Sequence, residues 1–235
     1  MRALENLPIS HTFGIPGVHT TELYDELDRS HKISPHLVCS EFSGSFMAEA
    51  LSRTTDTIGT LVIVPGAGFT HAASGIGEAF LDGIPLLVIS GGINYGEEYP
   101  AYQLHAVDQM ELAKGITKAA FRVTSHKDVA STIYEAYDIA TSGVPGPVFI
   151  EIPMNLLLRV SEDDIEVPDY QAPAPPTIND EEIERAVELL HTAKKPVLYL
   201  GWGARVCGQE TLVKLAERLE APVTTTLQGL SVFPA

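Results

Sequence analysis

One acidic residue, Glu41, stands where the sequence could place a carboxylate in a ligand pocket. It follows the apolar run LVCS (37–40), which is typical of a strand, and precedes FSGSFMAEAL, which has the period of an amphipathic helix. A carboxylate at this junction is fixed in position and partly removed from water, so it could share a proton with a ligand. The same position also suits an acid that only complements the positive end of a helix dipole. The residue type and position leave both interpretations open.

Glycine-rich turns are the second group of candidates, because glycine lets the backbone approach a ligand where a Cβ would clash. Each turn follows an expected strand, and open α/β sheets bind ligands at the carboxyl ends of their strands. None has the Gly-Lys-Ser/Thr of a phosphate loop, and GWGARV lacks the third glycine of a dinucleotide fingerprint. Each turn alone could equally be a tight strand-to-helix connection. The turns are FGIPG (13–17), PGAG (65–68), GG (91–92) and GWG (201–203).

Histidine offers a third kind of chemistry. His105, in the polar stretch YQLHAVDQ, could transfer protons at neutral pH, although a single loop histidine can also be solvated or structural. The remaining histidines show no HExxH or other ligand spacing, so we interpret them as surface or packing residues and predict no metal site in this chain. These histidines include His11, His19, His36, His126 and His191.

The elements that must position these residues follow an α/β pattern. Short apolar runs alternate with segments of helical period, as in βα units that build a parallel sheet covered on both faces. Several runs are almost continuously apolar, which is typical of strands buried on both faces. The clearest expected strands are LVCS (37–40), TLVIV (60–64), PLLVIS (85–90), PVFIEI (147–152), PVLYL (196–200) and PVTTT (222–226).

Two helices are expected to turn an apolar stripe toward the core. Residues three and four apart lie on the same face of a helix, so apolar residues at this spacing indicate the side that packs on the sheet. One stripe consists of Phe46, Met47, Ala50 and Leu51, and the other of Val129, Ile133, Ala136, Tyr137 and Ala140.

Proline and acidic residues mark a domain boundary. The stretch 160–180 contains SEDDIEVPDYQAPAPPTIND, whose prolines remove backbone donors and favour an extended, solvated linker. Asn179 followed by Glu182 predicts a helix cap directly after it. We therefore expect a first domain over 1–159, the linker over 160–180, and the first part of a second, incomplete α/β domain over 181–235.

Composition narrows the partners and the compartment. The formal net charge is −16, which repels nucleic acid and anionic membranes, although such acidity mainly keeps a protein soluble. Cys39 and Cys207 form no CxxC pair, which favours a reducing compartment. No apolar run approaches the roughly 18–20 residues that span a bilayer, and the N-terminus lacks a secretory pattern. A cytoplasmic protein without nucleic-acid or membrane partners is expected.

Several segments, in order, resemble the thiamine diphosphate-dependent enzymes, and among them acetolactate synthase. The segment VCSEFSGSFMAEALSR resembles the strand, glutamate and helix of that family, with Arg53 as its closing arginine. The resemblance covers nearly the whole chain and implies a six-stranded parallel sheet with helices on both faces. The other matching segments are FGIPGVHTTELYDEL, VPGAGFTHAASGIGEAFLDGIPLLVISGG, DQMELAKGITKAAFRV and GVPGPVFIEIP, followed by HTAKKPVLYLGWGARVCGQETLVKLAERLEAPVTTTLQG, which is similar to the start of the central domain.

The resemblance implies that Glu41 is the catalytic residue of a cofactor-binding pocket. In the family this glutamate hydrogen-bonds a ring nitrogen of the aminopyrimidine and favours its imino tautomer, so that the cofactor can activate its own thiazolium carbon. Departures from the family pattern near the expected site make Phe42 and His105 candidate substrate residues. The other positions that match the cofactor pocket are Pro16, Gly17, Gly68, Thr70 and His71, the last of which is asparagine in many relatives.

The resemblance also implies groups that this chain does not hold alone. In the family a third domain binds the diphosphate and Mg²⁺ through Gly-Asp-Gly, a motif that does not occur here. Each active site lies between two subunits, so a homodimer or tetramer is implied, and some relatives bind FAD in the central domain. The chain alone is therefore expected to be inactive.

The function implied is the decarboxylation of a small-molecule 2-oxo acid with carboligation, as in acetolactate synthase. A 2-oxo acid decarboxylase or oxidase of the same family is an alternative. So is a non-catalytic α/β binding module, against which Glu41 argues. A complete small subunit that pairs with a separate diphosphate-binding subunit is a further alternative, but the residues after the linker argue against it.

Overall fold

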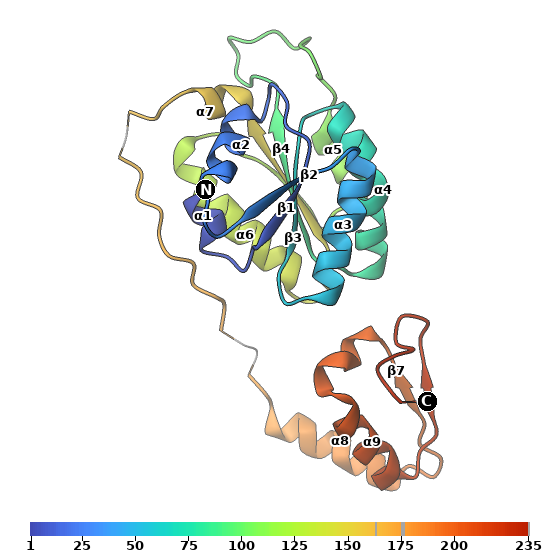
Figure 1. Cartoon of the computed structure of the whole chain (residues 1–235). Coiled ribbons are helices and arrows are strands. Elements are labelled where there is room, and N and C mark those ends of the chain that lie inside the picture. Colours follow the sequence, from blue (N-terminus) through green and yellow to red (C-terminus); the bar gives the residue numbers. More distant parts are fainter. Residues whose placement is uncertain (163, 175–176, 235) are drawn as a thin grey trace. The chain divides into compact units, whose positions relative to one another are not determined.

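A computed structural model describes residues 1–162, 164–174 and 177–234 of the chain (Figure 1). The chain divides into two compact units, Met1–Pro173 and Ala174–Ala235. The assignment of functional domains to 1–159 and 181–235 stays a prediction. Among the described residues, no helix combines the length and the apolar character needed to cross a membrane.

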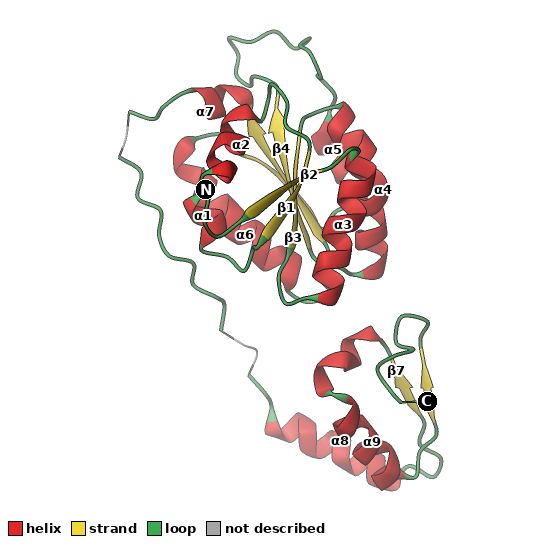
Figure 2. Ribbon diagram, in the orientation of Figure 1, coloured by secondary structure: helices red, strands yellow, loops and turns green. Residues whose placement is uncertain are grey.

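The first unit is built on a six-stranded sheet in which every pair of neighbouring strands is parallel (Figure 2). The strand order is β2-β1-β3-β4-β6-β5. The predicted α/β class and six-stranded parallel sheet are confirmed. The strands are β1 (His11–Gly14), β2 (Ser34–Leu37), β3 (Gly59–Ile63), β4 (Leu86–Gly92), β5 (Ala119–Arg122) and β6 (Pro147–Pro153).

Helices cover both faces of this sheet (Figure 1). One face packs against α1 (Arg2–Glu5), α2 (Thr21–Asp28), α6 (Val129–Thr141), which follows the 3₁₀ turn η1 (His126–Asp128), and α7 (Met154–Leu158). The other face packs against α3 (Glu41–Thr54), α4 (Ala67–Asp82) and α5 (Gln109–Ala113).

The central strands are apolar without interruption because they fill two cores at once. Successive side chains of a strand point to opposite faces. Leu61 and Val88 join the core under α3 and α4, whereas Val62 and Leu87 join the core under α6. Every residue of β3, β4 and β6 is buried, so the expected strands at 60–64, 85–90 and 147–152 are confirmed as elements.

The strand expected at 37–40 is wrong in position. The structure forms β2 over Ser34–Leu37, with all four residues exposed, because β2 lies at the edge of the sheet and pairs only with β1. Val38 is nevertheless buried, at 7% exposure, in the connection to α3. It packs against Gly44, whose ideal Cβ would lie 3.1 Å from Val38 Cγ2, so its apolar character reflects helix packing.

The apolar stripe predicted as the core side of α3 is also wrong. The helix buries Gly44, Ser45 and Ala48 instead, while Met47 is 50% exposed. Small residues are required there because α4 and β3 approach closely: a Cβ on Gly75 would overlap Ser45, and one on Gly59 would overlap the Ala48 carbonyl. The stripe of Phe46, Met47, Ala50 and Leu51 therefore lies outside the core.

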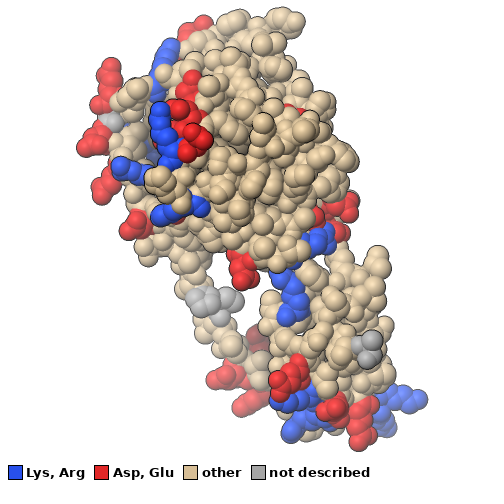
Figure 3. Space-filling model, viewed as in Figure 1, with Lys and Arg blue, Asp and Glu red and all other residues tan. Residues whose placement is uncertain are grey.

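The surface of the first unit on this side carries few charges (Figure 3). Phe42 and Met47 of α3 are each 50% exposed, and Leu81 of α4 is 81% exposed.

The apolar stripe predicted on α6 is confirmed. Ile133, Ala136 and Ala140 are buried, and Val129 and Tyr137 pack beside them, partly buried.

The second unit contains two short parallel strands with helices beside them. Its core is small, with Leu200, Leu212 and Val232 as the buried members. The cap predicted at Asn179 is confirmed, because its side-chain oxygen accepts a hydrogen bond from the Glu181 amide at 3.1 Å. The elements are α8 (Asp180–Thr192), β7 (Leu198–Leu200), η2 (Trp202–Cys207), α9 (Gln209–Leu219) and β8 (Val223–Thr225).

The stretch between α7 and α8 is not solvated along its whole length, in contrast to the prediction. The ring of Tyr170 lies 5.4 Å from the rings of both Tyr134 and Tyr137, and its hydroxyl donates to the Asp138 carboxylate. The hydroxyl of Tyr134 donates to the Pro168 carbonyl at 2.7 Å. Aromatic contacts and hydrogen bonds therefore attach this part of the linker to α6, despite its prolines.

We expect Tyr170→Ala to detach this part of the linker while leaving the sheet folded. The substitution removes two aromatic contacts, each of which contributes about 0.5–1.5 kcal/mol beyond the area it buries. Limited proteolysis of the chain should then cleave between 160 and 173 at least several-fold faster. Tyr199→Ala, at a 69% exposed tyrosine of the second unit, is the matched control. Equal cleavage rates for the two variants would contradict the attachment.

Candidate functional site

Glu41 is the first residue of α3 and is 7% exposed. Ser40, the N-cap residue, has an extended backbone (φ −159°, ψ 134°), so the helical conformation begins directly at Glu41, and the side chain of this first helical residue is already buried. The ring of His71 lies beside the carboxylate, with 3.4 Å between His71 Nδ1 and Glu41 Oε2. The side chain of His71 is itself 65% exposed. Glu41 is therefore a buried carboxylate, and its described hydrogen-bond partner, the ring of His71, is exposed.

The turn between β3 and α4 forms one wall around Glu41. An ideal Cβ on Gly68 would lie 3.5 Å from Glu41 Oε1 and 2.9 Å from Val64 Cγ2. Thr70 is exposed, and its hydroxyl donates to the Ala67 carbonyl at 3.2 Å. The structure therefore brings Gly68 to Glu41, and Thr70 lies exposed in the first turn of α4.

The turn between β1 and α2 forms a second wall, which meets the first at Val64. An ideal Cβ on Gly17 would lie 2.6 Å from Val64 Cγ1, whereas Pro16 is exposed. The carbonyl of Gly17 accepts hydrogen bonds from the hydroxyls of Thr20 (3.3 Å) and Thr21 (3.0 Å), which fixes the turn. Gly17 and Gly68 thus approach the same side chain from two different turns.

Tyr24, which carries no signal in the sequence, lies behind this group. Its hydroxyl donates to the Val62 carbonyl at 2.8 Å, and Gly14 leaves the room that this contact needs. Burial, and then the charge of Glu41, raise the pKa of Tyr24 far above its ordinary value. The phenol therefore stays protonated and acts as a fixed donor beside the carboxylate.

His105 is carried to the same site by the long loop between β4 and α5. Its backbone is left-handed (φ 65°) and lies against Gly66, whose ideal Cβ would be 3.0 Å from the His105 carbonyl oxygen. Gly66 is left-handed too, at φ 65°. The structure therefore brings His105 to the β3–α4 turn, next to the predicted pocket.

His19 was interpreted from the sequence as a surface or packing residue, and the structure corrects the surface interpretation. It is 5% exposed, and its ring meets that of His105 edge-on, with the ring centroids 5.5 Å apart. Nδ1 of His19 is buried and has no hydrogen-bond partner within the described part of the chain. Burial, and then the neighbouring His105, lower the pKa of His19. Its place two residues after the FGIPG turn was the only available signal.

Phe42 makes no contact with this group among the residues that the structure describes. It is 50% exposed, and its ring lies 5.1 Å from that of Phe46 on the outer side of α3. Arg53, the closing arginine of the segment, lies near the end of α3 and pairs with Glu49 and with Asp82 of α4. Arg53 therefore links α3 to α4.

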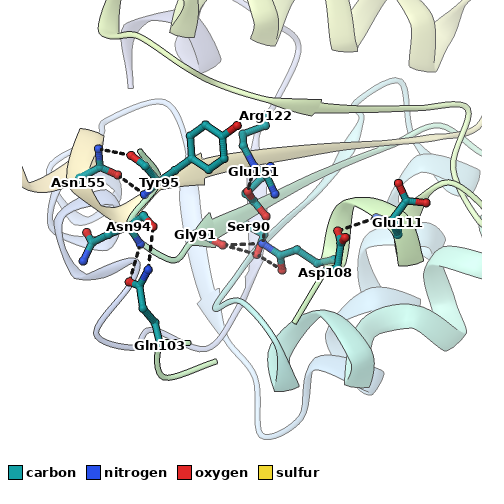
Figure 4. A network of polar contacts seen from close by, with 11 residues as sticks. Ser90, Gly91, Asn94, Tyr95, Gln103, Asp108, Glu111, Arg122, Glu151 and Asn155 are labelled. Atoms are coloured by element: carbon teal, nitrogen blue, oxygen red, sulfur yellow. Dashed lines mark hydrogen bonds and ion pairs between the residues drawn. The ribbon is translucent and has the colours of Figure 1, made fainter. Parts of the chain in front are cut away.

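A buried polar network anchors the base of the loop that carries His105 (Figure 4). Gln109 Nε2 donates to the Gly91 carbonyl at 3.0 Å and to Glu151 Oε2 at 2.6 Å, and Ser90 Oγ lies 3.2 Å from Gln109 Oε1. Arg122 pairs with the other oxygen of Glu151. The carboxyl ends of β4 and β6 and the start of α5 are therefore joined by side chains.

Two amides hold the loop itself (Figure 4). Gln103 bonds the backbone of Asn94 in both directions, at 3.1 and 2.9 Å, and Asn155 of α7 does the same to Tyr95, at 3.0 and 3.2 Å. The guanidinium of Arg122 lies 4.7 Å from the centroid of the Tyr95 ring. These contacts fix the path of the loop on both sides of its exposed tip.

We expect Gly66→Ala to loosen the loop over 93–108. An L side chain in the left-handed region costs about 1–2 kcal/mol, and the new methyl group would also press on the His105 backbone. Gly143→Ala is the matched control, because Gly143 is left-handed (φ 58°) with nothing within 4 Å of its ideal Cβ. Hydrogen exchange of the amides over 93–108 should rise several-fold in the first variant only; a similar rise in both would show that a general loss of stability, and not the contact with His105, loosens the loop.

The described residues contain no group of three or more histidine, cysteine or acidic side chains that could hold a metal ion. What they offer is a buried carboxylate beside Gly68 and His71, a protonated phenol close to it, and the paired rings of His19 and His105 at the adjoining β3–α4 turn. Such a site can share a proton with a ring nitrogen through Glu41.

Comparisons with known proteins identify the family. Residues 1–112 match the model of the N-terminal thiamine pyrophosphate-binding domain of thiamine pyrophosphate enzymes, and residues 183–235 match the model of their central domain. Thiamine pyrophosphate is another name for thiamine diphosphate.

Curated relatives point the same way. The whole chain aligns with the acetolactate synthase large subunit of Buchnera aphidicola at 33% identity, and with the isozyme 3 large subunit of Escherichia coli at 32%. The chloroplastic acetolactate synthase of Arabidopsis thaliana is 32% identical. The chain spans 42% of the length of each bacterial relative and 35% of the plant one. From the two matched domains and these relatives together, the chain belongs to the thiamine diphosphate-dependent enzyme family.

Proposed function

We propose that this chain supplies the aminopyrimidine-binding part of an enzyme that decarboxylates a 2-oxo acid and ligates the product to a second carbonyl compound, as acetolactate synthase does. The observation that carries the proposal is the carboxylate of Glu41, 7% exposed and bordered by Gly68 at 3.5 Å from its Oε1. The names of the relatives support the reaction class.

The residues present fit the aminopyrimidine ring. Gly17 and Gly68 let the side chain of Val64 lie against both turns, because a Cβ on either glycine would come within 3 Å of it, and the ring is proposed to pack on this apolar side chain. Pro16, Gly17, Gly68, Thr70 and His71 are proposed to border the ring, and Glu41 to bond its nitrogen. When bound, thiamine diphosphate would supply a carbon nucleophile for the oxo group and an electron sink for the pair of electrons that the departing carbon dioxide leaves behind.

The task of Glu41 is to share a proton with the ring nitrogen. Its enclosed position excludes water that would compete for that proton, because a hydrogen bond to an ionised group is strongest where it is shielded from solvent. Tyr24 stays neutral behind it, so no second negative charge forms there. His71 contacts the second carboxylate oxygen and limits how the side chain can turn.

The remaining groups of the active site are proposed to come from outside these residues. Mg²⁺ and the diphosphate would be held by a further domain of a second subunit, in a homodimer or tetramer, and FAD is a candidate ligand of the central domain. The exposed apolar side of α3, with Phe42 and Met47, supports a subunit contact close to Glu41. A cytoplasmic location and a small-molecule 2-oxo acid substrate belong to the same proposal.

The first experiment uses the full-length protein of which this chain is part. It is incubated with pyruvate, with and without thiamine diphosphate and Mg²⁺, and carbon dioxide and acetolactate are followed. Cofactor-dependent acetolactate is the expected result. Carbon dioxide without acetolactate would indicate a decarboxylase of the family with no ligation step. Neither product, with pyruvate or with a panel of larger 2-oxo acids, would favour a non-catalytic module and overturn the proposal.

A further inference from the structure

Two histidine rings next to the proposed cofactor pocket, those of His19 and His105, take no part in the proposed binding of the aminopyrimidine ring. His19, in the turn just before α2, and His105, in the 93–108 loop, meet edge-on with their ring centroids 5.5 Å apart. We propose that this histidine pair recognises the carboxylate of the 2-oxo acid substrate. The inference rests on the proposed function and adds to it the residues that select an anionic substrate.

The burial of His19 is the first observation that supports the proposal. The residue is 5% exposed, its Nδ1 is enclosed without a partner, and the backbone of Gly91 on β4 lies against its own backbone, where a Cβ would not fit. A buried N–H without an acceptor is rarer than a buried lone pair. The favoured neutral ring therefore carries its proton on Nε2 and can donate from that side.

The conformation of His105 is the second observation. A left-handed backbone is uncommon for a residue with a side chain, and it persists only where the surroundings impose it. Here Gly66 permits the close approach of the His105 backbone, because it has no Cβ, and the same residue begins the turn that leads to Gly68 and Glu41. The histidine pair is thus connected to the proposed cofactor pocket through one turn of three residues.

Charge decides which ligand the pair suits. Two adjacent imidazoles repel each other when both are protonated, which is why His105 contributes to keeping the pKa of His19 low. One carboxylate removes that repulsion and accepts a hydrogen bond from each ring. In a chain with a net charge of −16, two hydrogen-bond donors at this place would give an anionic substrate a favourable local contact that the overall charge does not supply.

The test measures binding and not turnover. The full-length protein, loaded with thiamine diphosphate and Mg²⁺, is titrated calorimetrically with oxamate, an unreactive mimic of pyruvate, and with its neutral methyl ester. His19→Leu should raise the Kd of oxamate about 10-fold or more, since a hydrogen bond to a charged group is lost. The Kd of the ester should change less than about 3-fold. His19→Gln, whose amide reaches toward the position of Nε2, should restore much of the oxamate affinity.

Two further variants protect the test against misfolding and general charge effects. His105→Asn changes an accessible loop residue and keeps a side chain that tolerates the left-handed backbone, so it should fold and also weaken oxamate. His191→Leu, at an exposed histidine of α8, is the matched control and should leave both Kd values unchanged. Equal weakening of oxamate and its ester, or no weakening in the His19 and His105 variants, would overturn the histidine pair.

Failure of the proposed function would look different. Exchange of the thiazolium proton for deuterium in the unsubstituted protein reports cofactor activation by Glu41 and does not need the substrate carboxylate. If that exchange is fast and His19→Leu leaves oxamate binding intact, the histidine pair is wrong and the function stands. If that exchange is absent, the proposed function itself fails.

Discussion

Glu41→Gln in the full-length protein is expected to slow the exchange of the cofactor's thiazolium proton by about 10²–10⁴-fold, the usual contribution of a positioned proton-transfer group. Glutamine has the size of glutamate but cannot share an acidic proton with a ring nitrogen. The fold should be retained, because the described hydrogen-bond partner of the carboxylate is the exposed His71 and its other described neighbour is the glycine Gly68. Exchange is followed by NMR in deuterated buffer at fixed cofactor saturation.

Glu49→Gln provides the matched control for this experiment. Glu49 lies on the same helix and is also 7% exposed, but its carboxylate pairs with Arg53 near the far end of α3. We expect Glu49→Gln to lower the stability of the first unit and to leave the exchange rate per folded molecule unchanged. Near-normal exchange in the Glu41 variant, or an equal loss in the Glu49 variant, would remove Glu41 from its assigned role.

Arg122→Leu is expected to give the largest loss of stability among the substitutions considered. The Glu151 side chain is 6% exposed and would keep a buried charge without its cation. Breaking a buried pair in this way costs about 3–5 kcal/mol, and the partial exposure of Arg122 brings the expected cost to about 2–3 kcal/mol. Urea unfolding of the chain, followed by far-UV circular dichroism, measures the change in free energy.

Two comparisons identify the cause of that loss. Arg159→Leu removes an exposed arginine that bonds Tyr99 at 2.7 Å, and it should cost less than about 1 kcal/mol. Adding Glu151→Gln to Arg122→Leu removes the unpaired charge and should recover part of the stability. A double variant less stable than Arg122→Leu alone would mean that packing, and not the buried charge, dominates.

The sequence predicted the buried strands well and the edge strand poorly, for one physical reason. β3, β4 and β6 are buried on both faces, so the apolar run coincides with the element itself. β2 is exposed on both faces, so nothing in SPHL marks it as a strand, and the apolar residue nearby, Val38, belongs to the packing of α3.

The same reasoning explains the error on α3. Helical period shows that a helix has an apolar side, but it does not show which side faces the sheet. Where two elements approach closely, the buried side must be small, as Gly44, Ser45 and Ala48 are here. Small residues that face each other on neighbouring elements, such as Gly75 and Ser45, indicate the buried side of α3 better than its apolar residues do.

For the candidate site, motifs located the turns and the fold supplied the neighbours. The sequence names Glu41, Gly17 and Gly68, and in the structure Gly17 and Gly68 both lie against Val64, while Gly68 also lies beside Glu41. Their binding roles stay predictions. The pairing of His19 with His105 joins residues 86 positions apart through a long loop, and no spacing rule relates such a loop to a particular turn.

The attachment of residues 167–170 to α6 bears on how the first unit can be produced alone. A first unit truncated after residue 159, just beyond α7, would lack Tyr170, and the rings of Tyr134 and Tyr137 would become more exposed to solvent. A recombinant product ending there would tend to self-associate during purification. Ending it at Pro173 keeps the natural cover in place and gives a better-behaved sample for spectroscopy.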